Sequence, residues 1–335
     1  MTRTALFSNR RTVIANTVLL LAMLTVVLAS LAMGTLHIPP DQVVHALLGQ
    51  GDPLTRMVVH DLRLQRSIAG LASGAALAVA GCVMQSLARN RLATPGIIGI
   101  DNAATAFAVA SVVGTGIALA PSTMALVGAA TATALAFGLA GANGTRGYRF
   151  IIAGLGIGAI AGAITQLMLS QVAIDDANAA YPWTVGSLNS RDRTSILILS
   201  AGLLTGYLCL QALARSLNAL QFSDPVAVAL GIRLRTLRVI GLSLSVLLTG
   251  CAVAVCGPVG LIALIAPELA RTVCRPGRMP ITASALAGAT LMLAADTIGR
   301  TLFSPLEVPV GVITAILGSP YLLWILLRPA NRSMR

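Results

Sequence analysis

The sequence predicts an all-α membrane protein that crosses the bilayer about ten times, and three observations carry this prediction. The chain of 335 residues is 56% hydrophobic and only 10% charged, and its mean hydropathy is +0.86. An average soluble domain carries roughly 25% charged residues. Apolar runs of about 20 residues, the length that spans a bilayer as a helix, recur along the chain. We therefore expect one transmembrane domain over residues 1–335.

Ten apolar runs are the expected transmembrane helices. The first follows three arginines and exceeds the apolar core of a signal peptide, so we interpret it as an uncleaved first helix. The eighth is too short to cross a bilayer of ordinary thickness and is expected to tilt, to re-enter, or to join the seventh across Gly257 and Pro258. The expected spans are 13–36, 66–87, 95–120, 122–141, 149–172, 194–214, 236–255, 257–270, 279–299 and 309–327.

The arginines assign an orientation to these spans. Ten crossings leave both termini on one side, and placing them in the cytoplasm puts 17 of the 23 basic residues inside and 6 outside. Cytoplasmic loops of membrane proteins carry an excess of basic residues. We therefore expect a multi-pass protein of the cytoplasmic membrane with both termini in the cytoplasm.

The chain also resembles itself. The segment Ala76–Val83 returns as Ala252–Val259 with five of eight positions identical, and an Arg-x-x-Arg precedes each copy. The second expected helix enters the cytoplasm and the seventh leaves it. Helices 2–5 and 7–10 would therefore form an inverted repeat, an arrangement that builds transport paths at the bilayer midplane. A match between two segments rich in Ala, Val and Gly can also arise from composition alone.

The fifth expected helix has one face of nearly bare backbone. Gly154, Gly158 and Gly162 recur every four residues, a spacing that lets a neighbouring helix approach closely. Thr165 and Gln166 lie a turn further on and are the clearest polar groups of this helix. These residues either pack against another helix, which is the default for such a pattern, or line a polar path.

Composition excludes several chemistries. All 23 basic residues are arginine, so the chain has no P-loop lysine and cannot hydrolyse ATP by that route. The arginines are scattered between apolar runs without an aromatic platform, which argues against nucleic acid as a partner. The five cysteines lack zinc-type spacing and are expected to be small buried hydrophobes. We assign no catalytic residue, no metal ligand and no bound cofactor.

Three arginines on the expected outer side oppose the charge bias. Arg63 and Arg66 lie at the outer end of the second helix, and Arg300 follows the ninth. One explanation is local pairing, because Asp61 lies beside Arg63 and Asp296 lies one helical turn before Arg300. The other is a basic outer rim that docks an acidic partner.

Several separated motifs, in their joint order and spacing, resemble the FecCD-type family of ABC permeases. These are the membrane subunits that import iron–siderophore complexes, haem or cobalamin. The resemblance covers about residues 36–328. The matching pieces are Arg63–Arg66, Gly74–Ala78 with Gly81 and Gln85, Arg89–Gly96 with Gly99, Trp183 with Gly186–Ser187, Gly257–Ile262, Ala266–Arg271, Ala295–Asp296 with Arg300, Glu307–Gly311, and Gly318–Pro320.

The resemblance implies a set of partners. Two such permeases, identical or paralogous, enclose one central path. Two separate ATPase subunits bind inside and use the ATP, and a substrate-binding protein docks outside. In the cobalamin importer of this family, three arginines face carboxylates of the binding protein, and the matching positions here are Arg63, Arg66 and Arg300. With the resemblance, docking becomes the favoured interpretation of these arginines.

The family also carries two short cytoplasmic coupling helices before the seventh span, which match residues 216–235 here. Their Glu-x-x-Ala-x-x-Leu-Gly pattern falls on Asp224, Ala227, Leu230 and Gly231. We expect the Asp224 carboxylate to cap free N–H groups at the helix start, and Gly231 to form the turn that ends it. The exposed face of this helix would fit a groove on the ATPase.

Three residues depart from the family pattern. Gln65 and Arg91 each replace a proline, and Glu268 replaces a histidine. Glu268 is expected to pair with Arg271 or Arg275, or to reflect a paired, non-identical permease. The loop 144–149 aligns with a cytoplasmic gate but differs in residue types, so we assign no gate residue.

The resulting hypothesis is a permease subunit of an ATP-driven importer that moves Fe(III)–siderophore inward. Haem and cobalamin are alternative substrates. An ion-coupled secondary transporter is a weaker alternative, because it needs a coupling group at mid-membrane and only Asp101 and Glu268 come near. An intramembrane enzyme would need clustered His, Asp or Ser residues, and the sequence offers no such cluster within its spans.

Overall fold

The structure is a computed structural model that describes residues 3–34, 36–114, 119–140, 148–189, 191–275, 277–304 and 306–327. Every regular element in these ranges is a helix. In chain order the helices are α1 (Arg3–Ala32), α2 (Pro40–Leu47), α3 (Pro53–Met57), the π-helical η1 (Val58–Leu64), α4 (Gln65–Ala88), the 3-10 helix η2 (Pro95–Ile98), α5 (Ile100–Val112), α6 (Pro121–Ala140), α7 (Tyr148–Ser170), α8 (Ile174–Val185), α9 (Arg193–Ala212), α10 (Ala214–Ala219), α11 (Asp224–Ala229), α12 (Leu234–Cys256), α13 (Gly260–Val273), α14 (Ile281–Thr301) and α15 (Val310–Leu327).

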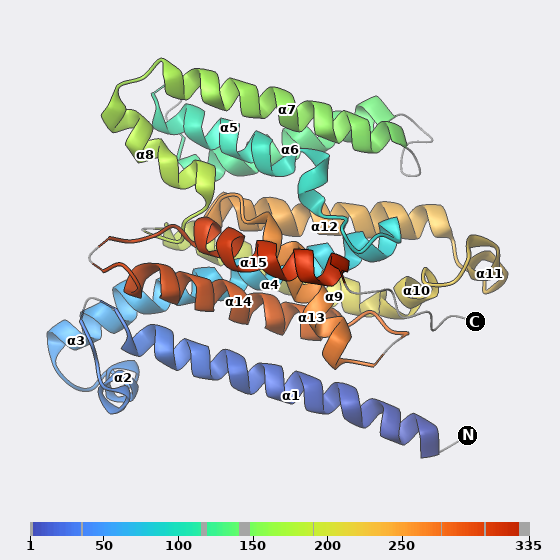
Figure 1. Cartoon of the computed structure of the whole chain (residues 1–335), viewed down its shortest axis with the longest axis horizontal. Coiled ribbons are helices and arrows are strands. Elements are labelled where there is room, and N and C mark those ends of the chain that lie inside the picture. Colours follow the sequence, from blue (N-terminus) through green and yellow to red (C-terminus); the bar gives the residue numbers. More distant parts are fainter. Residues whose placement is uncertain are drawn as a thin grey trace.

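The long helices run side by side along the longest axis of the molecule (Figure 1). α5, α6 and α7 pack against one another on one side, and α1 lies along α14 on the other. The short helices α2 and α3 lie at one end of the molecule, and α10 and α11 lie at the opposite end. We call these the α2 end and the α11 end.

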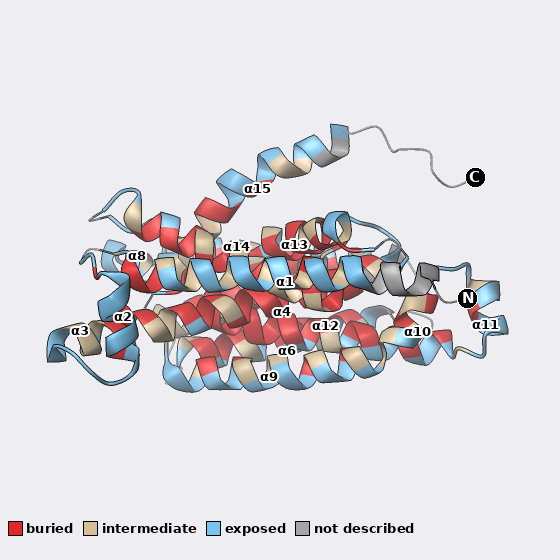
Figure 2. Ribbon diagram, turned by 90° about the horizontal axis from the view of Figure 1, so that it is seen from below, coloured by how far each residue is buried: buried red, intermediate tan, exposed pale blue. Residues whose placement is uncertain are grey.

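The core is built around α4, which packs against α9, α12, α13 and α14. Every residue from Ala72 to Val83 is buried (Figure 2). Small residues make this possible, because they let neighbouring backbones approach closely. A Cβ atom added at Gly74, for example, would lie 2.5 Å from Cβ of Met292 on α14.

The all-helical membrane fold expected from the sequence is confirmed. Seven of the ten expected segments form helices long and apolar enough to cross a membrane, and they lie in α1, α3–α4, α6, α7, α9, α12 and α14. The third and tenth segments form shorter apolar helices, Ile100–Val112 and Val310–Trp324. The eighth forms the 14-residue helix α13.

Two glycines interrupt the expected segments. Residues 95–120 were expected to form one helix, but η2 ends at Gly99, whose φ of +76° stops it before α5 begins. Gly257 has a φ of +71° and separates α12 from α13, so the expectation that these helices could join is wrong. α8 was not expected at all, because its first turn is polar and contains Asp175 and Asp176.

The two copies of the internal repeat lie in α4 and at the α12–α13 junction, and α4 packs against α12. The first copy is continuous helix, whereas the second is broken at Gly257. That the two halves are related by inversion stays a prediction.

α15 leans away from the rest of the bundle (Figure 2). Four of its large apolar side chains, Ile316, Leu317, Leu323 and Trp324, are exposed, whereas Val310 and Ile313 are buried. A cavity of about 370 Å³ opens between α15 and the start of α13, lined by Thr94, Pro258, Val259, Gly260, Leu261, Leu264, Gly311, Thr314 and Ala315. One side of α15 is therefore left uncovered by the described part of the chain.

Candidate functional site

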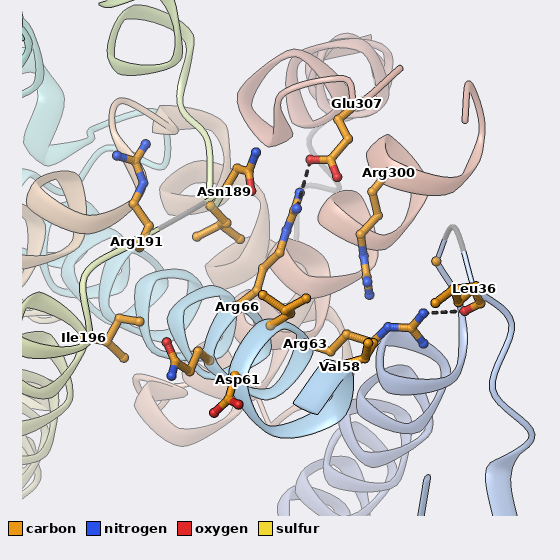
Figure 3. Close-up of a pocket in the computed structure, with 14 residues that line it drawn as sticks. Leu36, Val58, Asp61, Arg63, Arg66, Asn189, Arg191, Ile196, Arg300 and Glu307 are labelled. Atoms are coloured by element: carbon orange, nitrogen blue, oxygen red, sulfur yellow. Dashed lines mark hydrogen bonds and ion pairs between the residues drawn. The ribbon is translucent and has the colours of Figure 1, made fainter. Parts of the chain in front are cut away.

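An arginine-rich cavity of about 320 Å³ lies at the α2 end of the molecule (Figure 3). Its walls come from the segment after α1, from η1 and the start of α4, from the loop before α9, and from the region between α14 and α15. We call it the arginine pocket. Its charged lining residues are Asp61, Arg63, Arg66, Arg191, Arg300 and Glu307.

Arg63 caps the end of α1 rather than pairing with Asp61. Its guanidinium donates hydrogen bonds to the carbonyl oxygens of Leu31 at 2.6 Å and Ala32 at 3.0 Å, and to that of Leu36 (Figure 3). The last carbonyl groups of a helix lack partners within the helix, so these bonds complete α1. Arg63 is only 6% exposed and makes no ion pair among the described residues.

Arg66 and Arg300 share one buried carboxylate. Arg66 donates to both oxygens of Asp296 at 2.9–3.1 Å, and Nε of Arg300 lies 3.6 Å from Oδ2 of the same residue. Arg66 also binds Glu307 at 2.9 Å, and Arg300 donates to the hydroxyl of Ser30 at 2.7 Å. The predicted pairing of Asp296 with Arg300 is confirmed. The contacts tie together α1, α4, α14 and the segment that precedes α15.

Arg191 is a fourth arginine of the pocket, and the sequence did not single it out. Its guanidinium lies 4.0 Å from the centre of the Trp183 ring and donates to the carbonyl oxygen of Ser187 at 2.9 Å. Burial lowers the pKa of Arg191 to about 10, so it remains charged at neutral pH. The only feature of the sequence that could have identified Arg191 as a site residue was its place among the six arginines assigned to the outer side.

At the opposite end, two short helices occupy the stretch expected to couple to an ATPase. They are α10 and α11, joined by residues 220–223. Within α11, Ala227 is buried, whereas Leu230, at its end, is 62% exposed. Gly231 follows with a φ of +80°, which confirms the predicted turn.

The expected cap at Asp224 is wrong. Ser223 takes the N-cap position of α11, and no side chain caps the helix. The Asp224 carboxylate instead accepts hydrogen bonds from Arg89 and Arg238, each at 2.8 Å. Two guanidinium groups therefore hold this carboxylate, and it does not cap the first N–H groups of α11.

The glycine face of α7 packs against η2 and α5. A Cβ atom added at Gly99 would lie 2.6 Å from the carbonyl oxygen of Gly154 and 2.7 Å from the nitrogen of Gly158. The amide of Asn102 donates to the carbonyl oxygen of Gly158 at 2.9 Å and lies close to Gly162. On the same helix, the Thr165 hydroxyl donates to the carbonyl oxygen of Ala161, and Gln166 is exposed. These contacts favour the packing interpretation of the stripe.

Two of the residues that depart from the family pattern bind each other. Nη1 of Arg91 lies 3.0 Å from Oε1 of Glu268, although 177 positions separate them. Glu268 also pairs with Arg271 at 3.2 Å, one of its two expected partners, and Arg271 binds Gln85. Glu268 thus links the loop after α4 to α13. Loop 144–147 lies outside the described residues.

The chain is similar over nearly its full length to bacterial transport permeases. It is 33% identical to the ferric enterobactin transport system permease protein FepG of Escherichia coli (strain K12), covering 98% of this chain and 99% of FepG. It is 36% identical to the hemin transport system permease protein HmuU of Yersinia pestis, covering 80% and 82%.

The fold also matches a solved structure over nearly the full length of the chain. A metal-chelate type ABC transporter in an inward-facing conformation superposes with a TM-score of 0.82 at 27% identity, covering 93% of this chain and 98% of the other. The sequence also matches the FecCD transport family over residues 20–328. With its seven candidate spans, the chain is a multi-pass membrane transport component. It belongs to the FecCD transport family.

Proposed function

We propose that this chain is the permease subunit of a binding-protein-dependent ABC importer that moves Fe(III)–siderophore into the cytoplasm. The observation that carries the proposal is the full-length match to a ferric enterobactin permease, over a fold that superposes on a metal-chelate transporter. The chain supplies a conduit and no covalent chemistry.

A second permease subunit, identical or paralogous, completes the conduit. The exposed apolar face of α15 and the cavity between α15 and α13 support this proposal, because none of the residues that the structure describes covers them. Apolar residues of a spanning helix can face lipid, but an open cavity beside a helix that leans away is better closed by another protein.

A separate pair of ATPase subunits binds at the α11 end and consumes the ATP. The missing P-loop lysine supports this, as does the exposed apolar surface of α11, which includes Val226, Val228 and Leu230. We place the α11 end and both termini in the cytoplasm, since most arginines gather on that side of the predicted topology.

A substrate-binding protein docks at the α2 end on Arg63, Arg66 and Arg300. Arg66 is the residue suited to meet an incoming carboxylate, because its partner Glu307 is 42% exposed and can give way. Arg63 and Arg300 are committed to acceptors of their own chain and would hold the shape of the docking surface.

Two other functions are supported by a specific observation each. Haem is the alternative substrate, favoured by the similarity to a hemin permease; cobalamin remains a further expectation of the family. An ion-coupled secondary transporter is favoured by Asp101, whose Oδ1 is buried without a hydrogen-bond partner among the described residues.

Reconstitution separates these functions. Proteoliposomes holding the complex with its ATPase should accumulate radioiron–siderophore when binding protein and ATP are supplied, and not under an ion gradient alone. A panel of siderophores, haem and cobalamin then assigns the substrate. Uptake by the purified chain without ATPase would refute the proposal.

A further inference from the structure

Arg89 joins the inner end of α4 to the segment between α10 and α11. Its guanidinium donates to the carbonyl oxygens of Leu220 at 3.1 Å and Phe222 at 2.5 Å, and to the carboxylate of Asp224 at 2.8 Å. One side chain therefore bonds three residues of the stretch that leads into α11. Its contacts reach 131–135 positions along the chain.

The backbone of Arg89 is in a conformation that favours glycine. With φ of +50° and ψ of +32°, it is the C-cap of α4, and it is the one non-glycine residue with a positive φ in the described part of the chain. Glycine is the usual residue at such a helix end, because a Cβ atom is strained there. Strained residues concentrate where the side chain has a function that glycine cannot supply.

α4 connects this contact to the arginine pocket. The helix is unbroken from Gln65 to Ala88, and Arg66 at its other end binds Asp296 and Glu307. Close backbone packing against α14 and α13 leaves little room for α4 to bend. A displacement of its inner end therefore moves its outer end as well.

We propose that Arg89 is a positioning residue that fixes α11 to α4, so that movement of α11 is passed along α4 to the arginine pocket. The inference rests on the proposed function, in which an ATPase moves α11. It adds the route by which that movement reaches the opposite end of the chain.

The test uses the complete complex in proteoliposomes and compares Arg89→Gly, Arg89→Lys, Arg238→Gln and Arg91→Gln. Arg89→Gly removes the side-chain contacts and also removes the backbone strain, because glycine readily adopts a positive φ. Arg238→Gln removes an ion pair of the same 2.8 Å length with Asp224, made from α12 and by a more buried arginine. Arg91→Gln removes a neighbouring charge whose ion pair is made with Glu268. The readouts are melting temperature, ATPase co-purification, and solute transported per ATP hydrolysed.

We expect Arg89→Gly to melt no lower than the wild type and to keep its ATPase, while transport per ATP falls at least tenfold. Arg89→Lys should recover part of the coupling, because it restores the charge but not all three bonds. Both control variants should stay within twofold of the wild type in transport per ATP.

Normal transport per ATP in Arg89→Gly would overturn the inference. So would loss of ATPase binding in that variant, which would mean that Arg89 only shapes the docking site, or an equal loss of coupling in Arg238→Gln. A wild-type complex that does not transport at all would instead refute the proposed function.

Discussion

Asp296 is 2% exposed, and its single carboxylate pairs with two arginines in the arginine pocket. Its contrast with Glu307 is instructive, because both carboxylates bind Arg66 at 2.9 Å but Glu307 is 42% exposed. Removing one partner of a buried ion pair leaves an uncompensated charge, whereas an exposed pair is screened by solvent. The two ion pairs therefore have the same length but contribute differently to the stability of the protein.

We therefore expect Asp296→Ala to lower the stability of the protein by about 3–5 kcal/mol. Glu307→Gln should change it by about 0–1 kcal/mol, because the group it removes is largely in solvent. Melting temperatures of the two variants in the same detergent check this. Equal losses would show that burial does not set the strength of these pairs.

At this scale the sequence predicted contacts within one helix turn and missed those between distant segments. Asp296 with Arg300 and Glu268 with Arg271 follow from helical spacing. Arg63 binds main-chain carbonyl groups. Every residue has such a group, so the sequence does not show which ones an arginine will bind. Arg91 and Glu268 both depart from the family pattern and form an ion pair. Nothing in either substitution alone predicted that the two residues lie close together.

Small residues decide how the helices pack. Gly74→Ala places a Cβ atom 2.5 Å from Cβ of Met292, so α4 and α14 must separate. The expected loss is about 1–3 kcal/mol, typical of overpacking. Gly156→Ala is the matched control, because nothing lies within 4 Å of its added Cβ atom; it should be neutral or stabilising. A thermal melt that ranks Gly156→Ala below Gly74→Ala would contradict this account.

Gly231 allows a sharper test of α11. Gly231→Arg strains a φ of +80°, and its added Cβ atom has no neighbour within 4 Å; Gly49→Arg does the same at the α2 end, with a φ of +77°. Both should cost about 1–2 kcal/mol of backbone energy. Only Gly231→Arg should abolish uptake and ATPase co-purification while expression is kept. Undiminished co-purification would count against the coupling assignment.

Elements were predictable where hydrophobic length alone defines them. All seven long spans coincide with expected segments, because a bilayer demands long apolar helices. The break at Gly99 and the helix α8 were missed, since both are fixed by contacts. Gly99 stops a helix against the backbone of α7, and α8 buries Ala180 and Trp183 behind a polar first turn.

On the scale of the whole molecule, the two candidate contact surfaces lie at opposite ends, and their electrostatics can be tested separately. Arg66→Glu should weaken binding-protein affinity several-fold at low salt, and the difference should shrink as salt screens the charges. Arg193→Glu is the control, since this exposed arginine starts α9 but does not line the pocket. Binding affinity is measured for both variants across a series of salt concentrations. The same salt dependence in Arg66→Glu and Arg193→Glu would contradict the docking proposal.

The tilt of α15 has a consequence for evolution. If a companion chain closes the open side of the cavity beside α15, part of the surface that the solute touches is encoded by another gene. Recombining this polypeptide with a different companion would then create a new preference without a single substitution here. Substrate specificity would then belong to the pair of subunits. Two complexes could transport different solutes although this subunit had nearly the same sequence in both.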